Sequence, residues 1–208
     1  MAENDNLVYL LDGKIYINLT NLCTNDCIFC IRRLKDDVAG SNMRLKNEKI
    51  TAKDVIEQLK KVEDKIPLGI TFCGYGEPTI KTDIIIEVAR YIKSNYPQTK
   101  IRINTNGHGN VINKRNIIKD LKGLIDEFSI SLNAQDETLY NTLSKPKIEN
   151  AYSAMKEFAT DAVKAGIKTT MSVVTGYKDY NVDIKRCEEI AHNIGANFRN
   201  REWLDKGY

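Results

Sequence analysis

The sequence lacks the long apolar stretch that a membrane-spanning helix needs. Its longest segments without a charged residue, such as residues 66–76, contain 11 residues, against the roughly 20 apolar residues that cross a bilayer. The N-terminus reads MAEND and has no basic head followed by an apolar run, so nothing in it predicts a secretory signal. We therefore expect a cytoplasmic protein with no membrane partner.

Neither sign of charge dominates the chain. Lys and Arg number 31, Asp and Glu number 28, and the net charge is +3. The short pairs Arg32-Arg33 and Lys60-Lys61 form no basic stripe, which argues against nucleic acid as a partner. The charged fraction of 28% beside 42% hydrophobic residues is that of an ordinary globular protein and excludes intrinsic disorder. We expect one domain over residues 1–208, long enough to bury a core of its own.

The five cysteines do not form a disulfide framework or paired zinc motifs. In a reducing compartment they are thiols, metal ligands or catalytic groups. Cys23, Cys27 and Cys30 lie within eight residues in a polar loop, where cysteines that serve only as small buried residues seldom cluster. Three ligands are one fewer than a closed tetrahedral site requires, so they predict a metal centre with an open position. The alternative is a zinc-stabilised nucleic-acid-binding module whose fourth ligand is His108.

Apolar runs rich in β-formers alternate with amphipathic helical segments at intervals of about 30 residues, the length of a βα unit. Two alternating runs, 7–11 and 14–20, are joined by Asp12-Gly13 and predict a hairpin. Later strands are expected at 68–72, 100–104, 127–132, 167–174 and 196–203. Helices are expected at 51–64, 83–95, 111–121, 148–165 and 182–193.

This alternation implies parallel strands joined by right-handed crossovers. Six units are too few for the eight-stranded barrel, which typically takes about 250 residues. We therefore expect an α/β fold, a partial (β/α)6 TIM-like barrel with an N-terminal β-hairpin, with an open sheet as the alternative. In both architectures active sites lie at the carboxyl ends of the strands, and the three cysteines follow the first barrel strand. The polar segment 35–49 behind them is expected to form a mobile lid.

The pattern CxxxCxxC, with Phe29 before the last cysteine, resembles the signature of the radical S-adenosylmethionine (SAM) superfamily. The resemblance implies that Cys23, Cys27 and Cys30 are the catalytic cluster ligands, each holding one iron of a 4Fe-4S cluster, while SAM chelates the fourth iron. It implies an oxygen-sensitive enzyme that cleaves SAM reductively to a 5′-deoxyadenosyl radical, which abstracts hydrogen from a substrate. The segments YINLTNLCTNDCIFCIR and ITFCGYGEPT are similar to the small TatD-associated group within this superfamily.

The same resemblance implies cofactor-binding roles for other residues at this edge. The segment Gly74, Tyr75, Gly76, Glu77 and Pro78 resembles the GGEP motif, in which the second glycine and the glutamate receive the methionine amino group. Tyr75 departs from the first glycine of that motif. Phe29, Asn104 and Asn106 belong to the same candidate set, Ser131 and Asn133 are expected at the ribose, and Val174 at the adenine. Ordinary turn chemistry is the alternative interpretation of the polar members of this set.

The expected partners are SAM, an electron donor such as flavodoxin or ferredoxin, and an unidentified substrate, either a small molecule or an exposed loop of a partner protein. A second possibility in the same class is an activating enzyme that makes a glycyl radical on a partner protein. The sequence leaves open the roles of Cys73, His108, Arg199 and Arg201. The last two share one face of the final strand and suit a carboxylate or phosphate if that face points inward.

Overall fold

The computed structural model describes residues 5–38 and 40–203. Its centre is a seven-stranded sheet in the order β1-β2-β5-β6-β7-β8-β9. The first pair is antiparallel and every later pair is parallel. The strands are β1 (Val8–Leu11), β2 (Lys14–Ile17), β5 (Ile70–Phe72), β6 (Ile101–Thr105), β7 (Glu127–Ser131), β8 (Lys168–Thr175) and β9 (Asn197–Glu202). This is the α/β architecture with an N-terminal hairpin that the sequence predicts.

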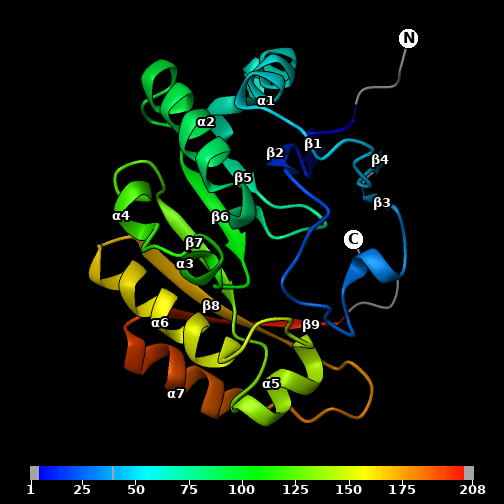
Figure 1. Ribbon diagram of the computed structural model, residues 1–208, viewed down its shortest axis with the longest axis vertical. Coiled ribbons are helices and arrows are strands. Elements are labelled where there is room, and N and C mark those ends of the chain that lie inside the picture. The colour runs from blue at the N-terminus through cyan, green and yellow to red at the C-terminus, as the bar shows by residue number, and fades with distance from the viewer. Residues whose placement is uncertain (1–4, 39, 204–208) are drawn as a thin grey trace.

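The helices cover one side of this sheet (Figure 1). They are α1 (Ala52–Leu59), α2 (Thr82–Asn95), α3 (Gly109–Ile112), α4 (Ile118–Leu121), α5 (Glu137–Ser144), α6 (Ala151–Lys164) and α7 (Ile184–Ile194), with the 3-10 helices η2 (Lys60–Leu68) and η3 (Pro78–Lys81). The 3-10 helix η1 (Ile31–Arg33) belongs to the long loop after β2, on the opposite side. The first long loop and the short strands β3 (Asp37–Val38) and β4 (Ser41–Asn42) lie on the other side. Among the described residues no helix is long and apolar enough to cross a membrane.

The two faces of the sheet differ because the strands alternate apolar and polar residues. Phe72, Ile103, Phe128 and Met171 point toward the helices and are fully buried in the main core. Their neighbours along each strand, such as Arg102 and Ser129, point to the opposite face and are only half-buried. We call this opposite side the inner face. Its polarity marks it as a surface that meets solvent or a ligand rather than a second apolar core.

The first expected helix is shorter than predicted. Thr51 and Asp54 form the expected capping box at the start of α1, because each side chain satisfies a free backbone N–H of the first turn. The helix changes to η2 at Lys60, and the backbone leaves helical geometry at Val62. The predicted strand 68–72 therefore begins only at Ile70, after Gly69, whose φ is 106°.

Two further helix predictions were wrong. The single helix expected at 111–121 is two short helices, α3 and α4, because the side chain of Asn110 accepts from the backbone N–H of Ile117 at 2.9 Å and interrupts the helical pattern. Helix α5 was missed before the helix expected at 148–165, which is α6. Asp136 caps α5 by accepting from Leu139 N at 2.9 Å, and an aspartate before Glu137 is the sequence signal for that start.

The segment expected to form a lid is anchored to the rest of the protein. Val38, Met43 and Leu45 are buried. Asn18 Nδ2 donates to Met43 O at 2.9 Å, and Asn21 Nδ2 donates to Leu45 O at 2.7 Å. These buried side chains and bonds argue against a free lid.

Candidate active site

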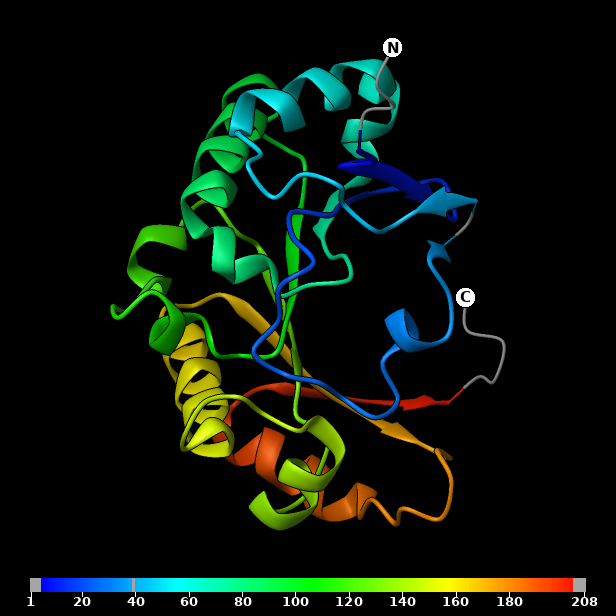
Figure 2. The same ribbon diagram turned by 45° about the vertical axis from the view of Figure 1, so that its right-hand side comes forward.

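The loops that follow β2, β5 and β6 meet at the carboxyl edge of the sheet (Figure 2). One residue, Asn106, joins all three loops. Its backbone N–H donates to Glu77 Oε2 at 2.7 Å, and its side-chain Nδ2 donates to Thr24 Oγ1 at 2.8 Å. Because parallel strands all end at the same edge, residues some 80 positions apart in the chain come into direct contact there. This edge is therefore the candidate active site.

The loop that carries the three cysteines, residues 22–30, is docked on the C-terminal end of α5 and the residues just after it. Backbone bonds fix it there at three points: Asp26 N to Ser144 O at 3.0 Å, Ile28 N to Leu143 O at 2.9 Å, and Lys147 N to Thr24 O at 2.7 Å. A further hydrogen bond runs from Tyr177 OH to Ile28 O at 2.9 Å. Segments distant in sequence thus hold the cysteine loop in one conformation.

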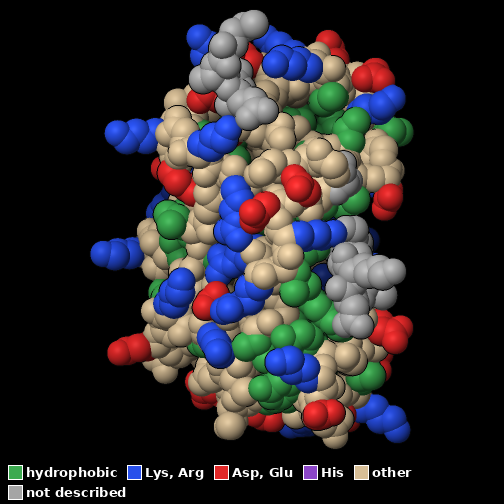
Figure 3. Space-filling model, turned by 90° about the vertical axis from the view of Figure 1, so that its right-hand side faces the viewer, with side chains coloured by type: hydrophobic (Ala, Val, Ile, Leu, Met, Phe, Trp, Pro, Cys, Tyr) green, Lys and Arg blue, Asp and Glu red, His purple; other side chains and the backbone are tan. Residues whose placement is uncertain are grey.

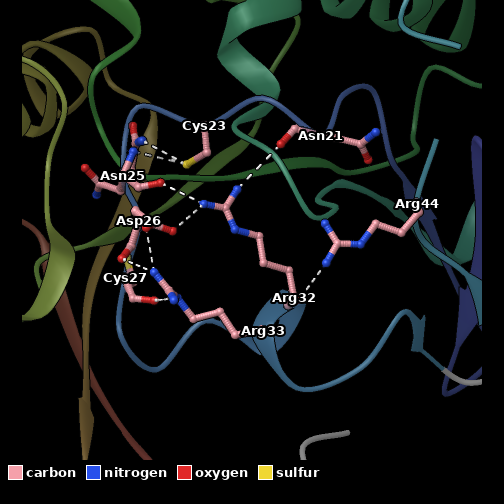
Figure 4. Close-up of polar contacts among 9 residues, drawn as sticks. Asn21, Cys23, Asn25, Asp26, Cys27, Arg32, Arg33 and Arg44 are labelled. Atoms are coloured by element: carbon pink, nitrogen blue, oxygen red, sulfur yellow. Dashed lines mark hydrogen bonds and ion pairs between the residues drawn. The ribbon is translucent and has the colours of Figure 1, made fainter. Parts of the chain in front are cut away.

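Arginine side chains brace the same loop (Figure 4). Arg32 Nη2 donates to Asn25 O at 3.0 Å and to Asp26 Oδ1 at 3.1 Å, and Arg33 Nη2 lies 2.6 Å from Asp26 Oδ2. Burial alone would raise the pKa of Asp26. The hydrogen bond from Arg32 and the charges of Arg33 and Arg32 outweigh it and lower the pKa of Asp26 below its usual value. The Arg32 side chain is 14% exposed, so its charge is held close to the thiols.

The three thiols are half-buried and lie near one another. Burial, together with the charge of Glu77, raises the pKa of Cys23 to about 11. Burial, together with the charges of Cys30 and Cys23, raises the pKa of Cys27 to about 12. Cys23 and Cys27 therefore stay protonated at neutral pH unless a cation takes them as thiolates. Across the described ranges, no three His, Cys, Asp or Glu side chains converge on one metal ion. In a 4Fe-4S cluster each thiolate binds a different iron, and the three half-buried thiols of this loop fit that donor set.

Glu77 is 2% exposed, and its carboxylate receives four hydrogen bonds from the chain itself. Oε1 accepts from Thr79 N at 3.0 Å, Thr79 Oγ1 at 2.7 Å and Thr105 Oγ1 at 2.7 Å, and Oε2 accepts from Asn106 N. Burial raises the pKa of Glu77, and these bonds oppose the rise. The carboxylate thus faces the neighbouring loops rather than an open ligand position, and its contacts join β5 to β6.

The two glycines of this loop are needed for close packing. A Cβ at Gly76 would collide with the backbone oxygens of Thr20 and Leu22, and one at Gly74 would collide with the Asn18 side chain. The backbone N–H of Glu77 also donates to Leu22 O at 2.7 Å. The loop after β5 is therefore pressed directly against the start of the cysteine loop.

Tyr75 and Pro78, the other two members of the motif, are buried. The Tyr75 hydroxyl donates to Lys35 O, and the Arg44 guanidinium lies 5.3 Å from the ring centroid. Tyr75 therefore anchors the segment 35–49 behind the cysteines. A tyrosine in place of the motif's first glycine thus serves packing. Pro78 is the first residue of η3, where its missing N–H costs no helical bond.

His108 is fully buried, and both ring nitrogens have partners. Nδ1 lies 2.9 Å from Thr24 Oγ1, while Nε2 lies 3.1 Å from Tyr140 OH and 3.2 Å from Ala151 O. Burial lowers the pKa of His108 to about 4, so the ring is neutral at neutral pH. These contacts argue against both the zinc-ligand alternative and a role as an exposed acid or base. His108 instead links the cysteine loop to α5 and α6.

The remaining candidates separate into two groups. Asn104, Ser131 and Val174 lie on the inner face and are half-buried, in positions open to a ligand. Asn133 is turned away: it is 1% exposed, and its Nδ2 donates to Ser144 Oγ at 2.9 Å. Asn133 therefore holds the end of α5 in place, and its side chain does not point toward the position expected for the ribose. Phe29 packs edge-on against Tyr177, with the ring centroids 6.0 Å apart.

Several residues of this network were not anticipated from the sequence. They are Thr24, Thr105, Tyr140 and Ser144, which contribute hydroxyl groups to the bonds around the cysteine loop and Glu77. Thr24 lies inside the cysteine motif, and that position was a usable signal. Tyr140 and Ser144 belong to α5, which the sequence analysis missed, so nothing local pointed to them.

Known proteins share this fold. SuiB from Streptococcus suis bound to S-adenosylmethionine is similar with a TM-score of 0.68 and 21% identity, covering 91% of this chain and 40% of SuiB. The FeFe-hydrogenase maturase HydG from Carboxydothermus hydrogenoformans has a TM-score of 0.62 at 16% identity, with 90% of this chain and 43% of HydG covered. Methylornithine synthase (PylB) has a TM-score of 0.59 at 16% identity, with coverages of 91% and 52%. The chain thus spans about 40–50% of the length of these proteins.

A search of curated proteins found no match to the sequence. The model of the Radical SAM superfamily matches residues 17–189, from β2 into α7. That range includes the three cysteines, the loop after β5 and the loop after β6 described above. The chain therefore belongs to the radical SAM superfamily, whose enzymes use a 4Fe-4S cluster and S-adenosylmethionine.

Proposed function

We propose that this protein is a radical SAM enzyme in which Cys23, Cys27 and Cys30 bind a 4Fe-4S cluster. The observation that carries the proposal is the cysteine loop, which places three half-buried thiols beside Arg32 at the carboxyl edge of the sheet. When bound, the cluster and SAM supply one-electron chemistry that yields a 5′-deoxyadenosyl radical for hydrogen abstraction from a substrate. The protein's own part is to hold the ligands and shape the space around them.

The residues around the loop fit these tasks. Backbone bonds to Leu143, Ser144 and Lys147 hold the three cysteines in place. Asn104, Ser131 and Val174 present half-buried side chains on the inner face, where SAM and the substrate would lie. Glu77 holds the loop after β5 in position, so that the backbone around Gly76 remains available to the methionine amino group. Glu77 therefore acts as a positioning residue for SAM.

The domain, the subgroup and the electron donor belong to the same proposal. One buried core runs from Leu7 to Ala196, which supports a single domain over residues 1–208. The segments YINLTNLCTNDCIFCIR and ITFCGYGEPT support kinship with the TatD-associated group.

Lys and Arg side chains gather along the middle of the face opposite the helices (Figure 3), which suits an acidic electron donor such as flavodoxin or ferredoxin.

The test replaces each cysteine of the loop by alanine in protein reconstituted without oxygen. Cys23→Ala, Cys27→Ala and Cys30→Ala should each lose complete cluster assembly and the formation of 5′-deoxyadenosine, since each thiolate ligates a different iron. The matched control is Cys187→Ala, a buried cysteine on α7 outside this edge. Iron and sulfide content and the brown colour are measured beside product formation. A colourless wild type with stoichiometric zinc would refute the proposal.

A further inference from the structure

The inner face of the sheet carries a row of polar side chains, whereas a barrel whose interior is only a packed core carries apolar ones there. Register places Thr71, Arg102 and Glu127 side by side, then Asn104 beside Ser129, and Ser131 beside Ser172. At the edge of the sheet, Arg199 lies beside Ser172 and Arg201 beside Val174. Arg102 and Arg201 therefore share this face.

Two arginines from distant strands, Arg102 on β6 and Arg201 on β9, have charges that act on Cys73. Burial raises the pKa of the Cys73 thiol, while a hydrogen bond from Asn104 and the charges of Arg201 and Arg102 oppose the rise. Both guanidinium groups thus lie close enough to act on Cys73, although β6 and β9 are separated by two strands in the sheet.

The charge of this group is incompletely neutralised by the chain. Arg102 Nη1 lies 4.0 Å from Glu127 Oε1, and Glu127 is shared with Lys168 Nζ at 3.3 Å. Arg201 has no hydrogen bond or ion pair within residues 5–38 and 40–203. The Nε atoms of Arg102 and Arg201 are buried without a partner, and so is Asn104 Oδ1. Buried donors of this kind normally have a partner, because an unmade bond is costly.

We infer that Arg102, Asn104 and Arg201, which share the inner face and have buried atoms without a partner, form a subsite for an oxyanion of the substrate, a carboxylate or a phosphate. Arginine presents a planar fork of N–H donors that matches both groups. Asn104 Oδ1 adds an acceptor for a hydroxyl or amino group beside the anion. The inference rests on the proposed function, since it assigns the substrate of that site to the class of small anionic molecules.

The experiment measures anion binding by the cluster-loaded protein, with and without SAM. Inorganic phosphate and glycolate are the probes, and potassium chloride at equal ionic strength is the baseline. The midpoint of thermal unfolding is followed against probe concentration, because a ligand of the folded state raises it. We expect at least one probe to raise the midpoint above the chloride baseline, and the tighter probe identifies phosphate or carboxylate as the recognised group.

The variants are Arg102→Gln and Arg201→Gln, with Arg201→Lys as the charge-preserving variant. Each Gln variant should weaken probe binding about tenfold or more, which is the loss of one charge-assisted bond, while Arg201→Lys keeps part of it. Arg90→Gln, on the exposed side of α2, should bind like the wild type. SAM affinity, measured by calorimetry, should stay unchanged in all variants.

Three results would overturn the inference. They are an unfolding midpoint that neither probe raises above the chloride baseline, unchanged probe binding in both Gln variants, and a loss of SAM affinity in the Gln variants as large as their loss of probe binding. The last result would mean that the arginines hold the carboxylate of SAM itself. Iron, sulfide and SAM binding of the wild type are measured on the same samples. Their absence would refute the proposed function, whereas an intact, SAM-binding protein that ignores both probes refutes this inference alone.

Discussion

Removing the Glu77 carboxylate should destabilise the fold as well as weaken SAM binding. Glu77→Ala leaves four donors without an acceptor, two of them backbone N–H groups, those of Thr79 and Asn106. Each buried donor left unsatisfied costs about 1–3 kcal/mol. Hydroxyl groups rotate to other partners but backbone amides cannot, so the expected loss in the free energy of unfolding is about 2–6 kcal/mol. Because Glu77 joins the loops after β5 and β6, SAM affinity should fall with the same substitution.

Urea unfolding followed by circular dichroism, together with SAM calorimetry on anoxically reconstituted protein, measures both effects. Glu77→Gln keeps the shape and one acceptor oxygen, so its loss of stability should lie between those of the wild type and Glu77→Ala. Glu87→Ala, on the exposed side of α2, is the control and should change stability by less than about 0.5 kcal/mol. A Glu77→Ala protein with unchanged urea midpoint but lost SAM affinity would refute the reasoning, because the carboxylate would then contact SAM directly.

Three other substitutions test the packing of the same edge. Since burial lowers the pKa of His108 to about 4, against about 6.5 when unfolded, the unfolded chain takes up the proton first. Stability should therefore fall by about 3 kcal/mol between pH ~6.5 and ~4, and His108→Gln should lack this component in urea titrations; equal pH profiles would contradict it. Gly76→Ala should prevent folding or displace the cysteine loop, judged by expression and iron content. Gly13→Ala, where no atom lies within 4 Å but φ is +73°, should carry only backbone strain and still fold. Normal iron content in Gly76→Ala would disprove the close packing. Tyr140→Phe removes the hydroxyl shared by His108 and Asn25 and should cost about 1 kcal/mol in urea unfolding; no change would mean that these bonds contribute nothing.

The sequence determined the parts of this protein that local pattern encodes. The spacing of Cys23, Cys27 and Cys30 indicated the metal chemistry and the family, and the alternation of β-rich runs with amphipathic helical segments indicated the parallel α/β fold. Both signals lie within short windows of the chain, so no tertiary information was needed. Helix boundaries were less certain, as α3, α4 and α5 show, because Asn110 and Asp136 direct the chain through side-chain bonds that periodicity does not register.

Only the tertiary structure decided which side chains face the candidate site. Glu77 and His108 follow strands and look like exposed ligands in the sequence, yet both are buried and fully partnered. Arg102 and Arg201 are 99 positions apart in the sequence, yet in the folded protein the charges of both act on Cys73. The sequence fixes which face of a strand a residue occupies, but the curvature of the sheet and the packing of loops determine its neighbours across the barrel. That is why the cysteines, and an anion-binding role for Arg201, could be suggested from the sequence, whereas the grouping of Arg201 with Arg102 and Asn104 could not.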